Sequence, residues 1–402
     1  MPKGPRQPVP ALALLAVATA AQVGVSILQQ GVAVLSYALG APLSLTLAQI
    51  GTLVSATSLG IMLAMLAGGA LIDRQGVRPV LLLSALITVL GASAIASQGS
   101  YIGLVLALGA TGFGLGALPI SGARVVFDAY PGRTRGLAMG VRQTGVPLGG
   151  AIAAAALPTL ALIYGAGSPW LSLALLAAAL NLVLAAAAPR APRVAPADRP
   201  PLGGDLRRMA LPALLGFILA AGQYGLLTFT VASRPGGIKP AAAGILLALS
   251  QIGGAAGRVG FGQLSDRLQA RPPAIAVAAG LGAVGIAVVS QLGPGAPFAV
   301  RAIAYVLAGA GAIGWNALVL TWSGERVSPG RSGQAIGIFG TSVFAGSAVW
   351  MPLMGLVAQR RGFPAAWLAL SGLIALAALI ALAAGTWARS GNSRLGSTNG
   401  GI

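Results

Sequence analysis

Long apolar runs follow one another along the whole chain and are separated by short polar segments. Each run is about as long as the roughly 20 residues that a helix needs to cross a bilayer, whereas barrel strands alternate apolar and polar positions over about 10 residues. Because lipid offers no partners for backbone polar groups, such runs are predicted to be helices. The pattern therefore predicts an all-α membrane protein with twelve transmembrane helices, near residues 11–39, 45–69, 79–97, 101–123, 136–163, 169–188, 209–233, 241–264, 273–292, 297–323, 333–358 and 364–388.

The composition agrees with a polytopic membrane protein. Of the 402 residues, 56% are hydrophobic and 8% are charged, and the mean hydropathy is +0.86. Soluble proteins carry about 25% charged residues. A soluble globular domain and a disordered chain are both excluded.

The basic residues are distributed unevenly between the predicted loops. The chain has 25 Lys and Arg against 6 Asp and Glu, which in a soluble protein would suggest nucleic acid. With the N-terminus in the cytoplasm, 17 of the basic residues fall in cytoplasmic segments, 4 in the opposite loops and 4 within predicted helices. Cytoplasmic loops of membrane proteins collect Lys and Arg. We therefore expect both termini in the cytoplasm, the lipid bilayer as a partner and no nucleic acid.

One hydrophilic stretch is longer than the others and divides the chain. Residues 189–208 are rich in Pro and Arg and lie between the sixth and seventh predicted helices. This composition is typical of a linker. We expect an N-terminal six-helix bundle at 1–188, a cytoplasmic linker at 189–208, a C-terminal six-helix bundle at 209–390 and a flexible cytoplasmic tail at 391–402.

The two predicted bundles carry matching loops. GALIDRQGVRP (69–79) follows the second helix, and GQLSDRLQARP (262–272) follows the eighth. Parallel repeats of six helices are typical of transporters whose substrate path lies between the halves. A second match, at an offset of 197, relates GLAMG (136–140) to GQAIG (333–337). At a constant offset of 193, six positions of the two loops agree: Gly69/Gly262, Leu71/Leu264, Asp73/Asp266, Arg74/Arg267, Arg78/Arg271 and Pro79/Pro272.

The first of these loops resembles the signature loop of the major facilitator superfamily, which lies between its second and third helices. The resemblance is carried by Gly69-x-Leu71-x-Asp73-Arg74-x-Gly76-x-Arg78, and residues 262–271 resemble the second copy that the family keeps. Two halves of six helices, a long central loop and a cytoplasmic N-terminus agree with it. The resemblance covers about residues 11–390 and implies a transporter.

The resemblance also implies a gating role for the paired loops. Charges of Asp73, Arg74 and Arg78, with those of Asp266 and Arg267, would close the cytoplasmic side in the outward-open state. Gly69 permits close helix approach, and Gly76 permits a tight turn. The charges could instead only cap short loops and set the topology.

Two side chains that commonly carry enzyme chemistry are missing from this sequence. There is no His and no Cys, so Ser–His chemistry and thiolate metal sites are excluded. No Asp or Glu lies deep in a predicted helix, and no nucleotide-binding G-x-x-x-x-G-K-[ST] loop is present. We expect a protein that is not an enzyme and has no metal and no cofactor.

Two arginines within predicted helices are candidates for substrate binding, because buried charges are costly. Arg258 lies 8 residues before Asp266, or about 12 Å along a helix. Its segment resembles the oxalate–formate exchanger and monocarboxylate porter branches, in which an arginine helps to bind the substrate carboxylate. Arg142 could join it on an anion path. Alternatively, Arg258 extends to the cytoplasmic surface or ties helices through backbone carbonyls, and Arg142 pairs with Asp128 or a loop acid.

Polar side chains inside the first, seventh and tenth helices would line the family's central cavity. They are Gln30, Gln223, Tyr224 and Asn316. Each could hydrogen-bond a substrate, or only bind a neighbouring helix.

The sequence as a whole favours a secondary active transporter that moves a small organic anion, a mono- or dicarboxylate, across an inner membrane by alternating access. The alternative is an exporter of neutral or amphipathic small molecules. We expect a monomer. The high Ala, Gly, Arg and Pro content suggests a GC-rich bacterial genome and hence a bacterial inner membrane. Proton symport, anion exchange and uniport all remain open.

Overall fold

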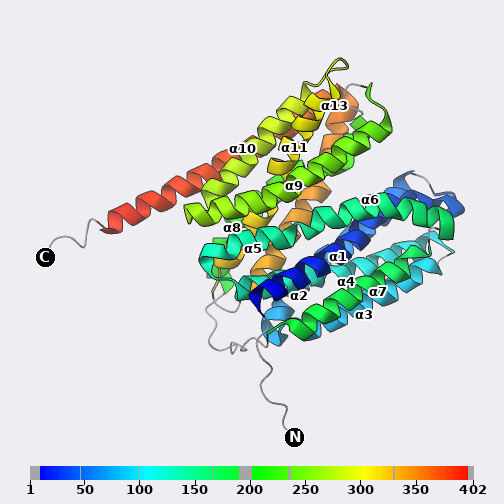
Figure 1. The fold of residues 1–402 in the computed structure, drawn as a ribbon, viewed down its shortest axis with the longest axis horizontal. Coiled ribbons are helices and arrows are strands. Elements are labelled where there is room, and N and C mark those ends of the chain that lie inside the picture. The colour runs from blue at the N-terminus through cyan, green and yellow to red at the C-terminus, as the bar shows by residue number, and fades with distance from the viewer. Residues whose placement is uncertain are drawn as a thin grey trace, which may run out of the picture. The chain divides into compact units, whose positions relative to one another are not determined.

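The computed structural model describes residues 10–45, 47–97, 99–165, 167–189, 202–233, 237–328 and 331–396. These residues form helices joined by short connections, and no strand occurs among them (Figure 1). The elements are α1 (Ala11–Gly40), η1 (Ala41–Leu43), α2 (Leu47–Gln75), α3 (Val77–Ala96), α4 (Tyr101–Ala129), α5 (Gly132–Gln143), α6 (Gly145–Tyr164), α7 (Pro169–Ala187), α8 (Leu202–Ser233), α9 (Pro240–Leu268), α10 (Arg271–Ser290), α11 (Phe298–Gly314), α12 (Asn316–Glu325) and α13 (Ser332–Gly396).

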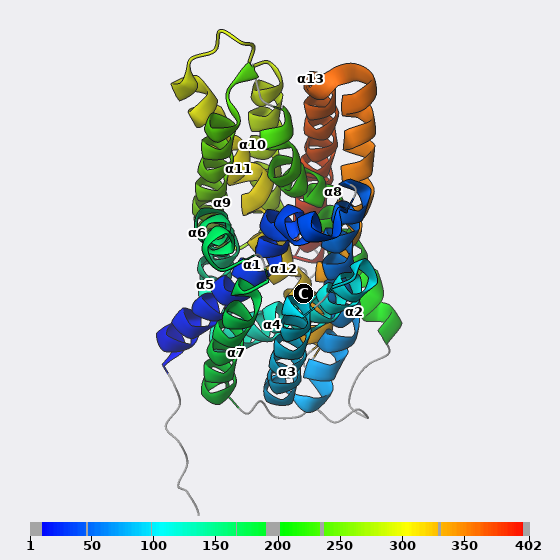
Figure 2. The same cartoon turned by 90° about the vertical axis from the view of Figure 1, so that its right-hand side faces the viewer.

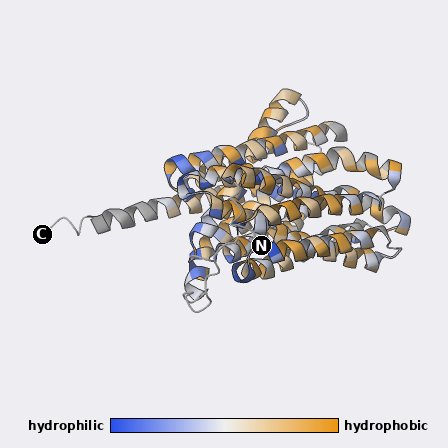
Figure 3. Cartoon of the chain, turned by 60° about the horizontal axis from the view of Figure 1, so that its bottom comes forward, coloured by the Kyte–Doolittle hydropathy of each residue, from blue (hydrophilic) through white to orange (hydrophobic). Residues whose placement is uncertain are grey.

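The helices expose apolar side chains, as expected of a protein surrounded by lipid. On α2, Leu59, Leu63 and Leu66 are each more than half exposed, and their spacing of four and three places them on one helix face. Apolar residues make up most of each helix (Figure 3). Exposed apolar side chains of this kind would promote aggregation in water but are stable against acyl chains.

Ten helical segments of the described residues are long and apolar enough to cross a membrane. One of them, Ser332–Gly385, has 54 residues, or about 80 Å at 1.5 Å per residue, against a hydrocarbon core of about 30 Å. Gly362, with φ 82° and ψ 164°, interrupts it and divides it into two crossings. Helices α5 and α6 together supply one more crossing, which gives the predicted twelve. The all-α, twelve-helix fold class is confirmed.

The chain divides into two compact units, each held together by its own packing. Unit 1 comprises Met1–Pro131, Val141–Ala210 and Ser323–Thr341, and unit 2 comprises Gly132–Gly140, Leu211–Trp322 and Ser342–Ile402. Each unit thus contains a short segment from the opposite half of the sequence: the start of α13 lies in unit 1, and most of α5 lies in unit 2. Residues 190–201 of the expected linker lie outside the described residues, and residues 202–208 begin α8. Residues 391–396 of the expected tail continue α13, and 397–402 lie outside the described residues.

Within unit 1, α4 packs against α2 and α3, and α7 packs against α1 and α3 (Figure 2). Within unit 2, α11 packs against α9 and α10. Glycine lets these backbones approach closely: a Cβ on Gly257 of α9 would lie 2.9 Å from the carbonyl carbon of Ala310 on α11. Small residues at helix crossings are the usual means of tight association in lipid, where no hydrophobic force drives helices together.

Candidate functional site

Asp73, at the end of α2, caps the start of α13. Its carboxylate accepts hydrogen bonds from the backbone amides of Gly333 at 3.1 Å and Gln334 at 2.8 Å. It also accepts one at 2.7 Å from Nη1 of Arg124, whose Nε donates to Asp128 at 2.6 Å. The Asp73 side chain is 2% exposed. A carboxylate at a helix N-terminus satisfies unpaired amides and lies at the positive end of the helix dipole. We refer to this arrangement as the Asp73 cap.

Asp266, at the end of α9, repeats the arrangement in unit 2. It accepts hydrogen bonds from the backbone amides of Gly136 at 3.0 Å and Leu137 at 2.7 Å, both in α5. Nη1 of Arg271 donates to it at 2.7 Å. Asp73 and Asp266 are related by the offset of 193, and their amide partners are related by the offset of 197. The sequence repeat is therefore a structural repeat, and we refer to this second copy as the Asp266 cap.

Glycines of the signature loop make the first cap possible. A Cβ on Gly69 would lie 2.5 Å from the carbonyl oxygen of Gly333 and 2.9 Å from the Cα of Gln334, so any larger residue would push α2 away from α13. Gly76 has φ 86°, a left-handed conformation that favours glycine, between α2 and α3. Both glycines therefore contribute through their small size and backbone freedom, as their sequence positions predicted.

The arginines of the signature loops have different surroundings from the carboxylates. Arg74 and Arg267 are exposed at the ends of α2 and α9. Arg78 donates to the carbonyl oxygen of Ala188, with Nη2 at 2.7 Å and Nε at 3.3 Å. It thereby satisfies a carbonyl at the C-terminus of α7, where a cation also complements the helix dipole.

Arg142 lies in the last turn of α5 and is 1% exposed. Its Nη1 donates to Oε1 of Gln22, on α1, at 2.8 Å. Nε2 of Gln22 in turn donates to Oγ of Ser26 at 3.1 Å. The sequence did not single out Gln22 as the partner of Arg142. The available signal was its spacing of eight from Gln30, which places both amides on a similar face of α1.

The hydrogen-bond ladder between α5 and α6 is interrupted directly after Arg142. Pro147 has no N–H group and cannot donate to the carbonyl of Gln143. Thr144 keeps right-handed helical dihedrals, but its amide bonds to Val141 three residues back, at 3.1 Å. Interrupted helices at membrane depth are a feature of transporter binding sites, so Arg142 occupies a position of functional interest.

Arg258, on the continuous helix α9, lies beside the interruption between α11 and α12 in unit 2. The side chain is 1% exposed, and its Nε donates to the carbonyl oxygen of Ile313 at 3.3 Å. Nε1 of Trp315 donates a hydrogen bond to the neighbouring carbonyl oxygen of Ala312 at 2.9 Å. Both side chains thus bind backbone carbonyls close to the point where α11 ends and α12 begins. The sequence alternative in which Arg258 ties helices through backbone carbonyls thus describes one of its contacts.

The uncharged candidates have different surroundings. Gln30 binds a neighbouring helix, because its Nε2 donates to the carbonyl oxygen of Val146 at 2.8 Å. Tyr224 lies within electrostatic reach of Arg258, and its ring centroid is 6.2 Å from that of Phe344. Asn316 is 8% exposed and begins α12.

Gln223, the last of the four candidates, has a buried acceptor. The side chain is 6% exposed, and its Oε1 accepts no hydrogen bond from the described residues. A buried carbonyl oxygen in this state costs about 1–3 kcal/mol. A substrate donor group would remove that cost.

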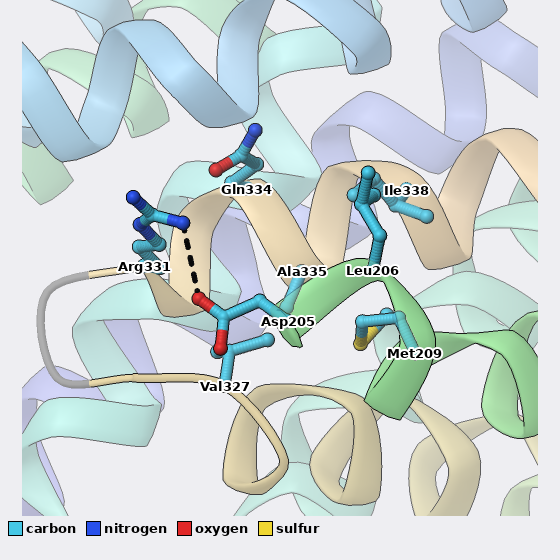
Figure 4. Close-up of a pocket in the computed structure, with 8 residues that line it drawn as sticks. All are labelled: Asp205, Leu206, Met209, Val327, Arg331, Gln334, Ala335 and Ile338. Carbon is cyan, nitrogen blue, oxygen red and sulfur yellow. Dashed lines mark hydrogen bonds and ion pairs between the residues drawn. The ribbon is translucent and has the colours of Figure 1, made fainter. Parts of the chain in front are cut away.

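A further buried carboxylate, Asp205, was expected in the linker but lies in the first turn of α8. It accepts hydrogen bonds from the amide of Ser328 at 3.2 Å and its hydroxyl at 3.0 Å, and it pairs with Arg331 at 3.1 Å. Asp205, Arg331 and Gln334 line a small open pocket with five apolar neighbours, and Arg331 points at the carboxylate (Figure 4). Asp205 therefore anchors the segment that leads into α13.

Beside this pocket, Arg326, which follows the span Phe298–Glu325, lies close to Arg208 on α8. Nε of Arg326 donates to the backbone carbonyl oxygen of Arg208 at 3.0 Å. Burial, and then the positive charge of Arg208, lower the pKa of Arg326. The pair concentrates positive charge at the end of unit 1 that carries the Asp73 cap.

Twelve apolar helices, a duplicated aspartate cap and buried arginines at interrupted helices together define a polytopic membrane transporter. Comparison with known proteins identifies the family. The chain belongs to the Major Facilitator Superfamily, whose family model matches residues 12–349 and, in a second overlapping match, 213–397. The resemblance seen in the sequence is confirmed, and the protein is a multi-pass membrane transporter and not an enzyme.

Individual relatives agree with this assignment. The chain is 32% identical over 337 residues to an uncharacterised MFS-type transporter of Mycobacterium tuberculosis, which covers 80% of this chain and 73% of the relative. It is 28% identical over 330 residues to monocarboxylate transporter 11 of Mus musculus, which covers 76% and 72% of the two chains.

Solved structures share the fold at low sequence identity. The E. coli fucose:proton symporter superposes with a TM-score of 0.72 at 17% identity, covering 93% of this chain and 98% of that one. The human organic anion transporter MFSD10 superposes with a TM-score of 0.69 at 15% identity, covering 93% and 100%. At these identities the likeness concerns the fold, and it extends over nearly the whole chain.

Proposed function

We propose that this protein is a secondary active transporter that carries a small organic anion, a mono- or dicarboxylate, by alternating access. The observation that carries the proposal is that each unit buries an arginine beside a helix interruption, Arg142 in unit 1 and Arg258 in unit 2. A buried guanidinium is costly in lipid, and it pairs with a carboxylate through two parallel hydrogen bonds. An anionic substrate supplies the opposite charge.

Neighbouring polar groups support the same proposal. Tyr224 is within electrostatic reach of Arg258, and Gln223 offers a buried acceptor one residue earlier on α8. A carboxylate substrate with a hydroxyl group would satisfy both a guanidinium and an amide oxygen. Asn316 in unit 2 and Gln30 in unit 1 are also proposed to bind substrate.

We also propose that the Asp73 and Asp266 caps act as gates. Each cap joins the last turn of one helix to another helix, α13 or α5, through two amide hydrogen bonds, and each carboxylate also binds an arginine. Breaking these bonds would release α13 or α5, and re-forming them would hold the helix again. Gly69, Gly76 and the exposed Arg74 and Arg267 belong to the same loops, as does Arg78.

The proposed setting is a bacterial inner membrane with both termini in the cytoplasm and a monomeric protein. The 17 to 4 division of basic residues between the two sides supports the orientation.

A neutral or amphipathic substrate is the second candidate. The contact of Arg258 with the Ile313 carbonyl favours it, since an arginine that satisfies a helix interruption has a structural role without any anion. The fold shared with a fucose:proton symporter is compatible with an uncharged substrate of this kind.

The test is uptake by purified protein in liposomes, with oxalate, formate, lactate and succinate as probes, with and without an imposed pH gradient. We expect Arg258→Ala and Arg142→Ala to lower uptake at least tenfold. Arg133→Ala, at an exposed position of α5, should transport like the unmodified protein. Arg258→Lys keeps a charge but loses the planar fork, and should recover only part of the activity.

Uptake of all four probes by both alanine variants at the normal rate, with unchanged protein amount and melting temperature, would refute the anion assignment. A dependence of uptake on the pH gradient would identify proton coupling, and counterflow without such dependence would identify exchange.

A further inference from the structure

Gln22 uses both ends of its side-chain amide inside unit 1. Its Oε1 accepts from Nη1 of Arg142 at 2.8 Å, and its Nε2 donates to Oγ of Ser26 at 3.1 Å. The side chain is 4% exposed. An amide with both ends occupied has one favoured orientation, so the acceptor that faces Arg142 is held in place.

Close backbone packing holds Gln22 against the interruption that follows Arg142. A Cβ on Gly145 would lie 2.9 Å from the Cβ of Gln22, and a Cβ on Gly149 would lie 2.6 Å from the Cβ of Ser26. Two glycines, four residues apart on α6, thus let α1 approach that helix. The Gln22–Arg142 contact is built into the packing of α1 on α6 and is more than a chance surface pairing.

The effect of a partner on the charge of Arg142 depends on whether that partner is a carboxylate or an amide. A carboxylate 2.8 Å from the guanidinium would form an ion pair and cancel its charge, as Asp73 does for Arg124. An amide directs the guanidinium through a hydrogen bond but contributes no net charge. A neutral partner therefore orients an arginine without competing with an incoming anion.

We propose that Gln22 is a positioning residue for transport: it orients the guanidinium of Arg142 toward a carboxylate substrate and leaves the positive charge of Arg142 in place. This inference rests on the proposed anion transport. It assigns Gln22 a part in choosing charged over uncharged substrates, a part that the sequence pattern did not indicate.

The experiment compares Gln22→Glu and Gln22→Ala with Gln49→Glu in liposome uptake of oxalate, formate, lactate and succinate. Gln49 is half-buried on α2 of unit 1, so Gln49→Glu adds the same charge elsewhere in that unit. We expect Gln22→Glu to raise KM at least tenfold, because its carboxylate competes with the substrate for Arg142. Gln22→Ala should raise KM several-fold with a smaller change in the maximal rate, and Gln49→Glu should stay within twofold of normal.

A purely structural role for Gln22 predicts a different result. In that case both Gln22 substitutions would lower the amount of folded protein and the melting temperature without changing KM or the order of preference among the four probes. Normal KM values in both Gln22 variants, together with loss of uptake in Arg142→Ala, would overturn this inference alone. Failure of the unmodified protein to take up any of the probes would overturn the proposed function and this inference with it.

Discussion

Replacing Asp73 by Asn tests the proposed gate directly. The change keeps the shape of the side chain but removes the charge and replaces one acceptor oxygen by an NH₂ group. In the Asp73 cap the two oxygens serve the amides of Gly333 and Gln334 and the guanidinium of Arg124. After the substitution, an NH₂ group faces a donor, and the remaining bonds lose their ionic character.

The magnitude follows from these bonds. A hydrogen bond to a charged group contributes about 1.5–3 kcal/mol, and one such bond is lost outright. A loss of about 2 kcal/mol multiplies the open fraction of the cap by about 30, since about 1.4 kcal/mol is a factor of ten. Larger losses are expected for Asp73→Ala, which removes every contact.

The chain contains no cysteine, so a single introduced thiol can report on the cap without background. Ser332→Cys places the thiol at a buried position beside Gly333. Maleimide should label Ser332→Cys roughly 30-fold faster when Asp73→Asn is also present, if opening precedes labelling. In the second copy, Ala138→Cys should respond in the same way to Asp266→Asn.

The crossed combinations are the controls. Asp266→Asn leaves the Asp73 bonds intact, so the labelling rate at Ser332→Cys should stay the same when the two caps are independent. An equal labelling rate at Ser332→Cys with and without Asp73→Asn would refute the reasoning that these bonds hold the start of α13. A response to both substitutions would show that the two caps are coupled.

Three further substitutions give distinct expectations. Gln223→Leu should raise the melting temperature slightly, because it removes a buried acceptor that costs about 1–3 kcal/mol, and it should raise KM if that oxygen binds substrate. Thermal unfolding and liposome uptake of the same sample measure the two effects, and a lower melting temperature with a normal KM would contradict both expectations. Gly257→Ala should destabilise the protein by about 1–3 kcal/mol, since its Cβ would meet the backbone of α11, while Gly260→Ala, three residues along α9 with nothing within 4 Å, should be neutral or slightly stabilising; equal melting temperatures would contradict the packing argument. Asp205→Asn should lower the free energy of unfolding by about 1–3 kcal/mol, because Ser328 and Arg331 lose their charged acceptor. An unchanged free energy of unfolding would indicate that the contacts of Asp205 are dispensable.

The apolar pattern alone was enough to predict the helices and their number. Hydropathy is a local property, since each run of about 20 apolar residues is stable in lipid only as a helix, whatever it packs against. The internal repeat was also visible, because the residues around Asp73 and Asp266 recur at a fixed offset. The left-handed turn at Gly76 followed from the same short motif.

The partners of these residues were decided by the tertiary structure. Asp73 meets amides 260 and 261 positions away, and Arg142 meets Gln22 at a separation of 120; no spacing rule reaches that far. Arg258 could be recognised as a buried charge, but its contact with the Ile313 carbonyl depends on the interruption between α11 and α12. Helix formation in lipid is dictated by the residues of one segment, whereas hydrogen-bond pairing between segments depends on how the helices pack, which the sequence encodes only collectively.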